Sequence, residues 1–488
     1  MIEGILIGLT TALTLQNILM VMVGCFFGTI IGMLPGLGPM TAIALMIPIT
    51  YGFEPATGLI LMAGVYYGAV FGGSTSSILL NAPGVPGTVA TSFDGYPMAQ
   101  QGKAGKALAI AAWSSFAGGT LSAIYLLFMA PSLSKVSLSF RSPDYFALMM
   151  LGLTAVSAFS SKGQFLKAMM MVVLGLMLAS IGQDSLSDIS RFTFGNMNLS
   201  DGISFVLIVM ATFAMSEALT IIFRGKDPNR VAKQISLTEL GSIKVNKEET
   251  IKMAKTIPRS SILGFLIGVL PGAGATIASF LAYGMERNYV SDEEKEKFGK
   301  GSVHGLSAPE TANNAACSGS FVPLLTLGIP GSGTTAVMLG ALLGFGIQPG
   351  PRLYQTNPEI FWSVIMSMYI GMVVLLILNL PLIPYIARIL AVPRNFLIPL
   401  ILFFSITGIY LMSFNNFDIY LMIGIALIAT FLRLYEFPMP PLILAFVLGK
   451  LIEENLRRSL LISDGSFSFL WDRPLTSVSY THLTLPTN

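Results

Sequence analysis

The chain alternates between long apolar stretches and short charged segments. Residues 4–53, 55–93, 107–134, 260–285, 311–351 and 361–387 contain no Asp, Glu, Lys or Arg. A helix needs about 20 apolar residues to cross a bilayer, so the longest of these stretches must fold back on themselves. The pattern predicts an all-α polytopic membrane protein with about 10 to 12 membrane segments.

Glycine and proline interrupt the apolar stretches. The first interruption is "IGMLPGLGPM", from Ile31 to Met40. Relative to alanine, a glycine costs a helix roughly 1 kcal/mol and a proline about 3 kcal/mol. In lipid, a broken backbone is tolerated only where it is buried in protein or lines a cavity. We therefore expect discontinuous helices or re-entrant hairpins at these positions.

The interruptions recur in the second half of the chain. "GTIIGMLPGLGPMTA" (28–42) returns as "GFLIGVLPGAGATIA" (264–278), and "LLNAPGVPGT" (79–88) is echoed by "TLGIPGSGTT" (326–335). Two related pairs in the same order indicate a tandem duplication. We predict a first transmembrane repeat over 1–223, a basic cytoplasmic linker over 224–258, a second repeat over 259–466 and a tail over 467–488. The last part of that tail resembles translated sequencing-adapter sequence, so it carries no weight in the fold prediction.

The distribution of positive charge predicts the orientation of the two repeats. The segment from Arg224 to Arg259 holds nine Lys and Arg against four acidic residues, which places it in the cytoplasm. Counting membrane crossings in both directions from this segment places the loop at Lys103 on the cytoplasmic side and the equivalent loop near Arg352 on the outer side. Only Lys135 and Arg141, on the predicted outer side, argue against this assignment. The sequence therefore predicts two inverted repeats.

Inverted repeats with interrupted helices are typical of secondary transporters. A helix that breaks in the membrane exposes free N–H groups at one new end and free C=O groups at the other. These ends can hold an anion and a cation without a buried charged side chain, and glycine lets the backbone approach the ligand. A kink that serves only packing is the alternative interpretation. The backbone positions predicted to bind substrate or ion are Pro35, Gly36, Gly38, Pro271, Gly272, Gly274 and Gly331.

Polar side chains cluster next to the interruptions. Hydroxyls and amides can donate hydrogen bonds to a carboxylate, and their oxygens can ligate a cation such as sodium. They could equally bond to their own helix or hold helices together. Glu310 could couple transport to a proton or sodium, or lie at the cytoplasmic mouth as a helix-terminal charge. The predicted polar site residues are Ser74, Thr75, Ser76, Asn81, Glu310, Asn313, Asn314, Ser318, Thr326 and Ser332.

The composition of the chain narrows its possible partners, cofactors and functions. Only 11% of the residues are charged, the net charge is +3, and the two cysteines cannot form a disulfide framework. We expect Cys25 and Cys317 to be small buried hydrophobes. No nucleic-acid partner and no organic cofactor are expected. The phosphate-binding pattern of an ATPase is absent, because "FGKGS" at Phe298 lacks the required glycine spacing.

Three other functions compete with a secondary transporter. A channel is the main alternative within transport, although the chain has no ring of charges or repeated filter. An intramembrane hydrolase could pair His304 with Ser332, but no buried acid in the sequence clearly orients this histidine, and a structural role is the simpler interpretation. A non-transporting scaffold is disfavoured by the polar clusters at the interruptions. We therefore expect a protein that is not an enzyme.

The long motifs resemble one known family. "GMLPGLGPMTA", "YYGAVFGGSTSSILLNAPGVPGTVATSFDGYPMAQQGKAGKAL", "GVLPGAG", "APETANNAACSGSFVPLLTLGIPGSGTTAVMLGAL" and "EENLRRSLLISDG" are similar to the large membrane subunit (TctA) of the tripartite tricarboxylate transporters. The resemblance extends from about residue 6 to residue 466.

The resemblance implies a carrier in the bacterial inner membrane that imports citrate or other carboxylates. It implies a small membrane subunit (TctB-like) and a periplasmic solute-binding protein (TctC-like) as partners, with the lipid bilayer as surroundings. It also implies that an ion gradient drives import, with sodium or proton as the coupling ion. A carrier that works without a binding protein is the alternative.

Overall fold

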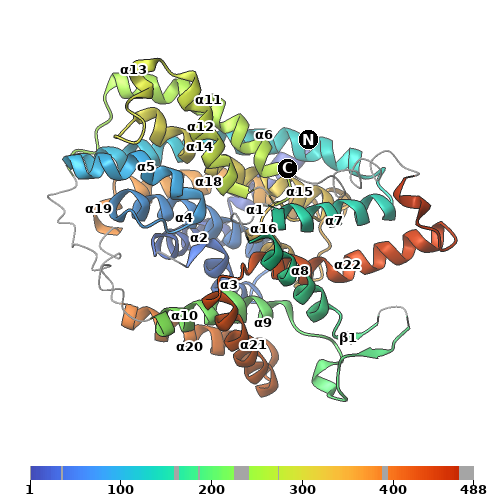
Figure 1. Cartoon of the computed structure of the whole chain (residues 1–488). Helices are drawn as coiled ribbons and strands as arrows, with labels where there is room; N and C mark the ends of the chain where they lie inside the picture. The colour runs from blue at the N-terminus through green and yellow to red at the C-terminus, as the bar shows by residue number, and fades with distance from the viewer. Residues whose placement is uncertain are drawn as a thin grey trace.

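The computed structural model describes residues 2–34, 37–158, 164–184, 187–224, 241–272, 274–386 and 394–471, and these are almost entirely helical (Figure 1). The elements of the first half are α1 (Ile2–Ala12), α2 (Leu15–Met33), α3 (Gly38–Thr50), α4 (Pro55–Leu80), η1 (Pro86–Thr88), α5 (Val89–Met98), η2 (Ala99–Lys103), α6 (Ala104–Ser137), α7 (Ser142–Ala158), α8 (Phe165–Ala179), β1 (Gly182–Gln183), β2 (Ser190–Arg191), η3 (Met197–Leu199), α9 (Phe205–Val209), η4 (Met210–Met215) and α10 (Ser216–Arg224). The elements of the second half are α11 (Lys247–Val269), α12 (Gly274–Tyr289), α13 (Asp292–Lys295), α14 (Val303–Gly319), α15 (Phe321–Leu327), α16 (Gly333–Gly344), α17 (Leu353–Thr356), α18 (Pro358–Asn379), α19 (Ile383–Ile386), α20 (Arg394–Ser413), α21 (Asn416–Leu434), α22 (Pro440–Ile462) and η8 (Phe467–Leu470).

Six helical stretches within the described residues are long and apolar enough to cross a membrane. Five shorter apolar helices accompany them, among them α3 and α16, which follow interruptions. The prediction of an all-α polytopic membrane protein is confirmed at this level. The short antiparallel pair β1–β2 is the only sheet that the described residues form.

The two copies of the first predicted interruption end a helix in the same way. α2 closes at Leu34, whose extended backbone still donates to the Ile31 carbonyl at 3.0 Å. α11 closes at Leu270, which is also extended and donates to Ile267 at 3.1 Å. The chain then reverses and begins α3 and α12, respectively. The returning helix is short in each case, as expected of a re-entrant hairpin.

Close helix packing depends on glycine at the repeated positions. A Cβ atom at Gly32 of α2 would overlap the Ala69 carbonyl oxygen of α4. A Cβ atom at Gly268 of α11 would overlap the Ala316 carbonyl oxygen of α14 in the same way. Small residues let helix backbones meet this closely in membranes. The glycines of the repeated motif therefore have a packing role beside any role in binding.

The contacts define the relative directions of the central helices. Gly24, Gly28 and Gly32 face Leu61, Val65 and Ala69 in that order, so α2 and α4 run parallel. Gly264 and Gly268 face Ala312 and Ala316, so α11 and α14 also run parallel. Between the halves the order reverses: Ser74 of α4 meets Glu310 of α14, whereas the earlier Tyr66 packs against Phe321, which begins α15 directly after the end of α14. α4 and α14 therefore run antiparallel.

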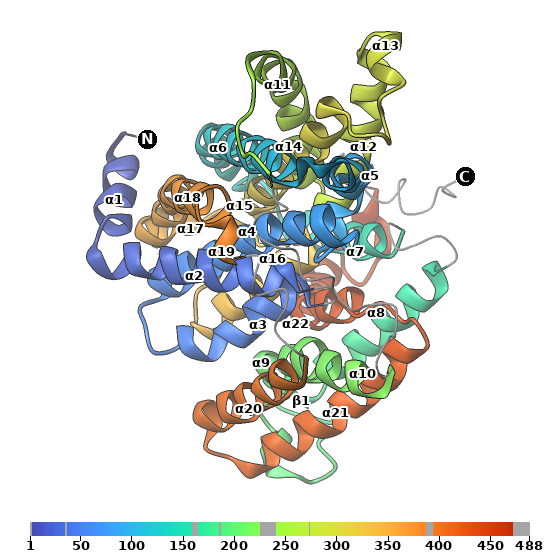
Figure 2. The same cartoon turned by 90° about the vertical axis from the view of Figure 1, so that its left-hand side faces the viewer.

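α4 and α14 form the centre of the molecule. Every described position of α14 from His304 to Gly319 is buried, and so is α4 from Ala56 to Leu79. A helix that is buried on all sides lies inside a larger bundle. In both views α11, α12 and α14 lie towards one end of the molecule, and α10, α20 and α21 lie towards the other (Figures 1 and 2).

Loops that are distant in the sequence contact each other. Gln101 donates to the Lys300 carbonyl at 2.8 Å, and Lys167 donates to the Tyr435 carbonyl at 2.7 Å. Asn415 donates to the side-chain oxygen of Asn198 at 2.9 Å.

The predicted linker and the tail lie only partly within the described residues. α11 begins at Lys247, within the predicted linker 224–258, with a capping box between Asn246 and Glu249. Residues 225–240 and the adapter-like end of the tail, 472–488, lie outside the described residues. Cys25 and Cys317 are free and buried, which confirms the prediction made for them.

Candidate functional site

The two interruptions of the second half lie against each other. The Gly272 amide donates to the Gly331 carbonyl at 3.0 Å. Gly272 and Gly274 have φ angles of +85° and +63°, which glycine adopts without steric cost. The nearest atom to a Cβ at Gly274 would be the Ser332 Cβ, at 3.9 Å, so the space beside this break is open.

The first half presents a similar break. Gly38 begins α3 with φ +67°, and a Cβ placed there would meet no atom within 4 Å. Gly84, in the second interruption, approaches the Gly32 carbonyl so closely that a Cβ would overlap it. The predicted residues Pro35 and Gly36 lie outside the described residues.

Each half sends a polar side chain to the break of the other half. The Tyr66 hydroxyl of α4 lies 3.5 Å from the Ser332 hydroxyl, at the second break of the second half. The Asn313 amide of α14 donates to the Gly87 carbonyl, at the second break of the first half, at 3.4 Å. Because α4 and α14 run antiparallel, these two contacts lie on the same side of the Ser74–Glu310 contact along the helices. The centre of the protein is thus shared by both halves.

Glu310 lies fully buried in the middle of α14. Its Oε2 accepts hydrogen bonds from the hydroxyls of Ser74 and Ser115, each at 2.7 Å. Its Oε1 accepts a short hydrogen bond from Thr91. No ion pair to Glu310 is formed within the part of the chain that the structure describes. The carboxyl group is therefore held by hydroxyls from α4, α5 and α6.

Several buried polar atoms near the crossing of α4 and α14 lack a hydrogen-bond partner among the described residues. They include the Tyr67 hydroxyl, Asn314 Oδ1 and the Ser318 hydroxyl. Asn314 and Ser318 are four residues apart on α14 and share a face. Buried polar groups in native proteins nearly always have a partner. These atoms are therefore candidates for contact with a bound ion, water or substrate.

The remaining predicted residues have local hydrogen bonds. The hydroxyls of Ser76 and Thr326 bond to the carbonyls of Gly73 and Val322 in their own helices. Ser332 caps α16 through a reciprocal pair with Thr335. Thr75 is buried and faces a small cavity, and Pro271 is half-buried at its break.

Asn81 has a clear structural role. It ends α4 with φ +50° and an exposed side chain, and its N–H bonds to the Ser76 carbonyl. Asparagine tolerates this left-handed conformation better than most residues. The equivalent position after α15 is Gly328, with φ +68° and an N–H bonded to Pro323.

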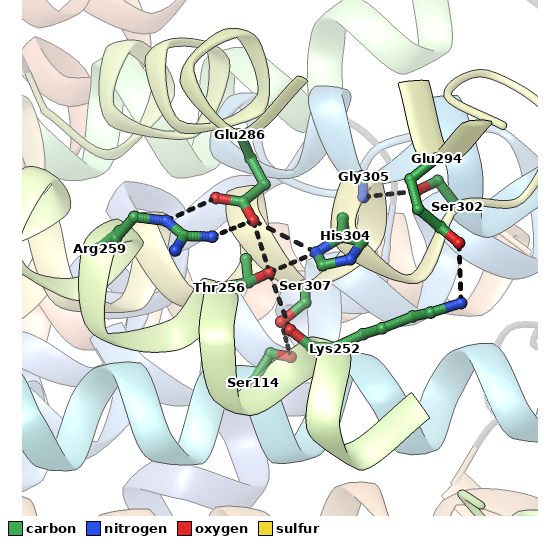
Figure 3. A network of polar contacts seen from close by, with 10 residues as sticks. All are labelled: Ser114, Lys252, Thr256, Arg259, Glu286, Glu294, Ser302, His304, Gly305 and Ser307. Atoms are coloured by element: carbon green, nitrogen blue, oxygen red, sulfur yellow. Dashed lines mark hydrogen bonds and ion pairs between the residues drawn. The ribbon is translucent and has the colours of Figure 1, made fainter. Parts of the chain in front are cut away.

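His304 belongs to a polar network at one end of α11, α12 and α14 (Figure 3). Its Nδ1 lies 2.7 Å from the Thr256 hydroxyl and 3.2 Å from Glu286 Oε1. Glu286 is buried and pairs with Arg259 at 2.6 Å. The view that no buried acid orients this histidine is therefore wrong, because Glu286 does so. Since His304 bonds to these groups and Ser332 caps α16, the Ser–His pair of a hydrolase is not formed.

The network continues to α13, outside the membrane segments. Lys252 lies 3.0 Å from Glu294 (Figure 3). Lys297 lies 2.6 Å from the same carboxylate. Partial burial raises the pKa of Glu294, but its bonds to Lys297 and Lys252 outweigh this and hold it below its usual range. These contacts tie α11 and α13 together.

Four important residues were missed in the sequence. Thr91 and Ser115 hold Glu310, Tyr66 reaches the opposite break, and Asn379 lies at the end of α18. Each is a polar side chain in a charge-free stretch, which is a usable signal. Their relation to Glu310 and the breaks depends on contacts between helices distant in sequence.

Comparison with known proteins decides the family. A family profile described as "Tripartite tricarboxylate transporter TctA family" matches residues 18–444. The chain belongs to the TctA family. The resemblance seen in the motifs is therefore confirmed, and this TctA protein is a membrane component of a tripartite transport system. Membership of a transporter family also supports the expectation that it is not an enzyme.

Two relatives come from Agrobacterium vitis. One, described as an uncharacterized 52.8 kDa protein in the TAR-I ttuC' 3' region, is 42% identical over 477 residues, covering 98% of this chain and 93% of the relative. The other, from the TAR-II ttuC' 3' region, is 42% identical over 214 residues, covering 44% of this chain and 88% of the relative. No solved structure matches this TctA protein.

Proposed function

We propose that this TctA protein is the translocating subunit of a secondary transporter that imports small carboxylates of the citrate or dicarboxylate class. An ion gradient drives import, and a periplasmic binding protein supplies the substrate. The observation that carries the proposal is the shared centre, where polar side chains of each half reach the helix break of the other. Site residues at the interface of two related halves are typical of such carriers.

The direction of the helices supports an inverted duplication. α2 and α4 form a parallel pair, α11 and α14 form the equivalent pair, and the two pairs run in opposite directions. The closest packing occurs at matching motif glycines, Gly32 and Gly268. Related halves of opposite direction are one of the arrangements found in secondary transporters, in which one repeat rocks against the other around a fixed site.

The chemistry of the breaks suits a carboxylate. The N-terminal ends of α3 and α12 carry N–H groups without a partner in their own helix and the positive end of the helix dipole, whereas Ser332 caps α16. Gly38 and Gly274 leave space at these two ends. The buried hydroxyls of Tyr67 and Ser318 lie near each other and have no other partner among the described residues, so this pair can donate a further hydrogen bond. An anionic oxygen could thus be bound without a buried arginine.

Membership of the TctA family implies that the protein works with partner subunits. We propose two such partners. A small TctB-like membrane subunit would complete the complex, and a TctC-like binding protein would deliver substrate on the periplasmic side. The bacterial inner membrane is the location that fits this arrangement.

Uptake by reconstituted vesicles tests the proposal. The purified chain is reconstituted with and without the small subunit and the cognate binding protein, and citrate and dicarboxylates are offered under imposed sodium or proton gradients. We expect saturable, gradient-dependent uptake only when the binding protein is present. Full-rate uptake by the chain alone would show a binding-protein-independent carrier. Uptake that equilibrates without saturation would indicate a channel.

A further inference from the structure

A small cavity lies next to the buried Glu310. Its volume is about 10 Å³, close to the space that one water-sized particle needs. Residues of α4, α6 and α18 line it, and it is partly open. Its polar lining consists of Ser74, Thr75, Ser115 and Asn379.

The lining presents oxygen lone pairs. A serine hydroxyl has one proton. Ser115 directs its proton to Glu310 Oε2, and Ser74 directs its proton to the same oxygen at 2.7 Å or to the Val70 carbonyl at 3.3 Å, so the lone pairs of both hydroxyl oxygens stay available. Asn379 is 4% exposed, and its amide nitrogen donates to the Leu375 carbonyl at 3.0 Å. Its Oδ1 is buried without a partner among the described residues. Three oxygens are therefore available as acceptors at one cavity.

The charge of the surroundings favours a cation with a single charge. Burying a carboxylate is costly unless an opposite charge lies close by. Two hydroxyls of the cavity bond to Glu310. A cation bound to those hydroxyl oxygens would therefore lie close to the Glu310 carboxylate. One monovalent ion balances one carboxylate, whereas a divalent ion would leave an excess charge. Small, hard cations prefer oxygen ligands of this kind.

We propose that this cavity binds one sodium ion, with Ser74, Ser115 and Asn379 as ligands and Glu310 as the compensating charge. Binding joins α4, α6, α14 and α18 at one point. Asn313, one helical turn beyond Glu310 on α14, contacts the break at Gly87. The ion would therefore order the helix that also forms the shared centre. Its role as the coupling ion rests on the proposed function, whereas its binding does not.

Binding of radioactive sodium to the detergent-purified protein tests the site directly. We expect saturable binding that unlabelled NaCl displaces and that KCl or choline chloride at equal ionic strength does not. Thermal unfolding followed in the same salts should show a midpoint several degrees higher in NaCl than in KCl. Equal midpoints together with no displaceable binding would overturn the proposal, and would indicate that a water molecule occupies the cavity.

Three variants locate the site. Asn379→Ala, Ser115→Ala and Glu310→Gln should each raise the sodium concentration for half-maximal stabilisation at least tenfold. Ser122→Ala is the matched control, because Ser122 lies on α6 and also bonds to α14, through the Ala315 carbonyl at 2.7 Å. It should respond to sodium like the unmodified protein. Sodium stabilisation that persists in Asn379→Ala and Glu310→Gln would place the ion elsewhere and refute the assignment.

Vesicle uptake separates this inference from the proposed function. Sodium binding by a protein that transports no carboxylate, even with its partners, would support the cation site and contradict the transport proposal. Carboxylate uptake that is indifferent to sodium, by a protein that binds none, would support transport and overturn the site.

Discussion

The glycines that begin α3 and α12 provide the sharpest test of the break hypothesis. Gly38 and Gly274 have φ angles of +67° and +63°, and an added Cβ would meet no atom within 4 Å at Gly38 and only the Ser332 Cβ, at 3.9 Å, at Gly274. An alanine in this conformation costs about 1–2 kcal/mol. Folded proteins are stable by about 5–15 kcal/mol. Gly38→Ala and Gly274→Ala should therefore still fold and insert.

Uptake should respond differently from stability. If substrate or ion approaches the backbone at these breaks, the new methyl group occupies the space that the ligand needs, and uptake should fall to background. The assay is carboxylate uptake by vesicles containing all three components. Thermal unfolding and size-exclusion chromatography of the same variants measure their folding.

Gly346→Ala is the matched control. Gly346 also has a positive φ, +73°, and an added Cβ there would meet no atom within 4 Å, but it lies beyond α16 and away from the breaks. It should lose the same small amount of stability and keep its uptake. Gly32→Ala, by contrast, should reduce the yield of folded protein, because its methyl group would overlap the Ala69 carbonyl of α4. Normal uptake kinetics in both Gly38→Ala and Gly274→Ala would mean that the breaks are packing kinks.

Three further predictions concern topology, capping and the polar network. A cysteine replacing Lys103 should be labelled from the cytoplasm and one replacing Asn416 from the periplasm; labelling from one common side would contradict the predicted orientation. Asn81→Gly should preserve thermal stability and uptake, whereas Asn81→Ala should lower stability by about 1 kcal/mol because of its positive φ; a selective loss of substrate affinity in both variants would instead assign the side chain to the site. Arg259→Ala should destabilise the protein by about 2 kcal/mol, since it leaves the buried Glu286 without its charged partner; an unchanged unfolding midpoint would show that this pair contributes nothing.

The sequence by itself determined the class of protein and the positions where α2 and α11 break. These features are readable because each depends on local chemistry. Apolar length fixes membrane spans, and only glycine and proline interrupt a helix in this way. Leu34 and Leu270 end their helices where the repeated motif predicted. The motif also identified Glu310 as a buried candidate, since a lone carboxylate in an apolar stretch rarely lacks a function.

The tertiary structure decided which side chains meet. Thr91 and Ser115 contact Glu310 only because α5 and α6 pack against α14, although they lie 219 and 195 residues away in the sequence. Asn379 enters the same region from α18. Such contacts depend on how closely helices approach, and this is set by glycines that allow backbone contact and by side-chain shape across the whole bundle. No local pattern encodes that geometry, so the partners of Glu310 could be found only in the folded chain.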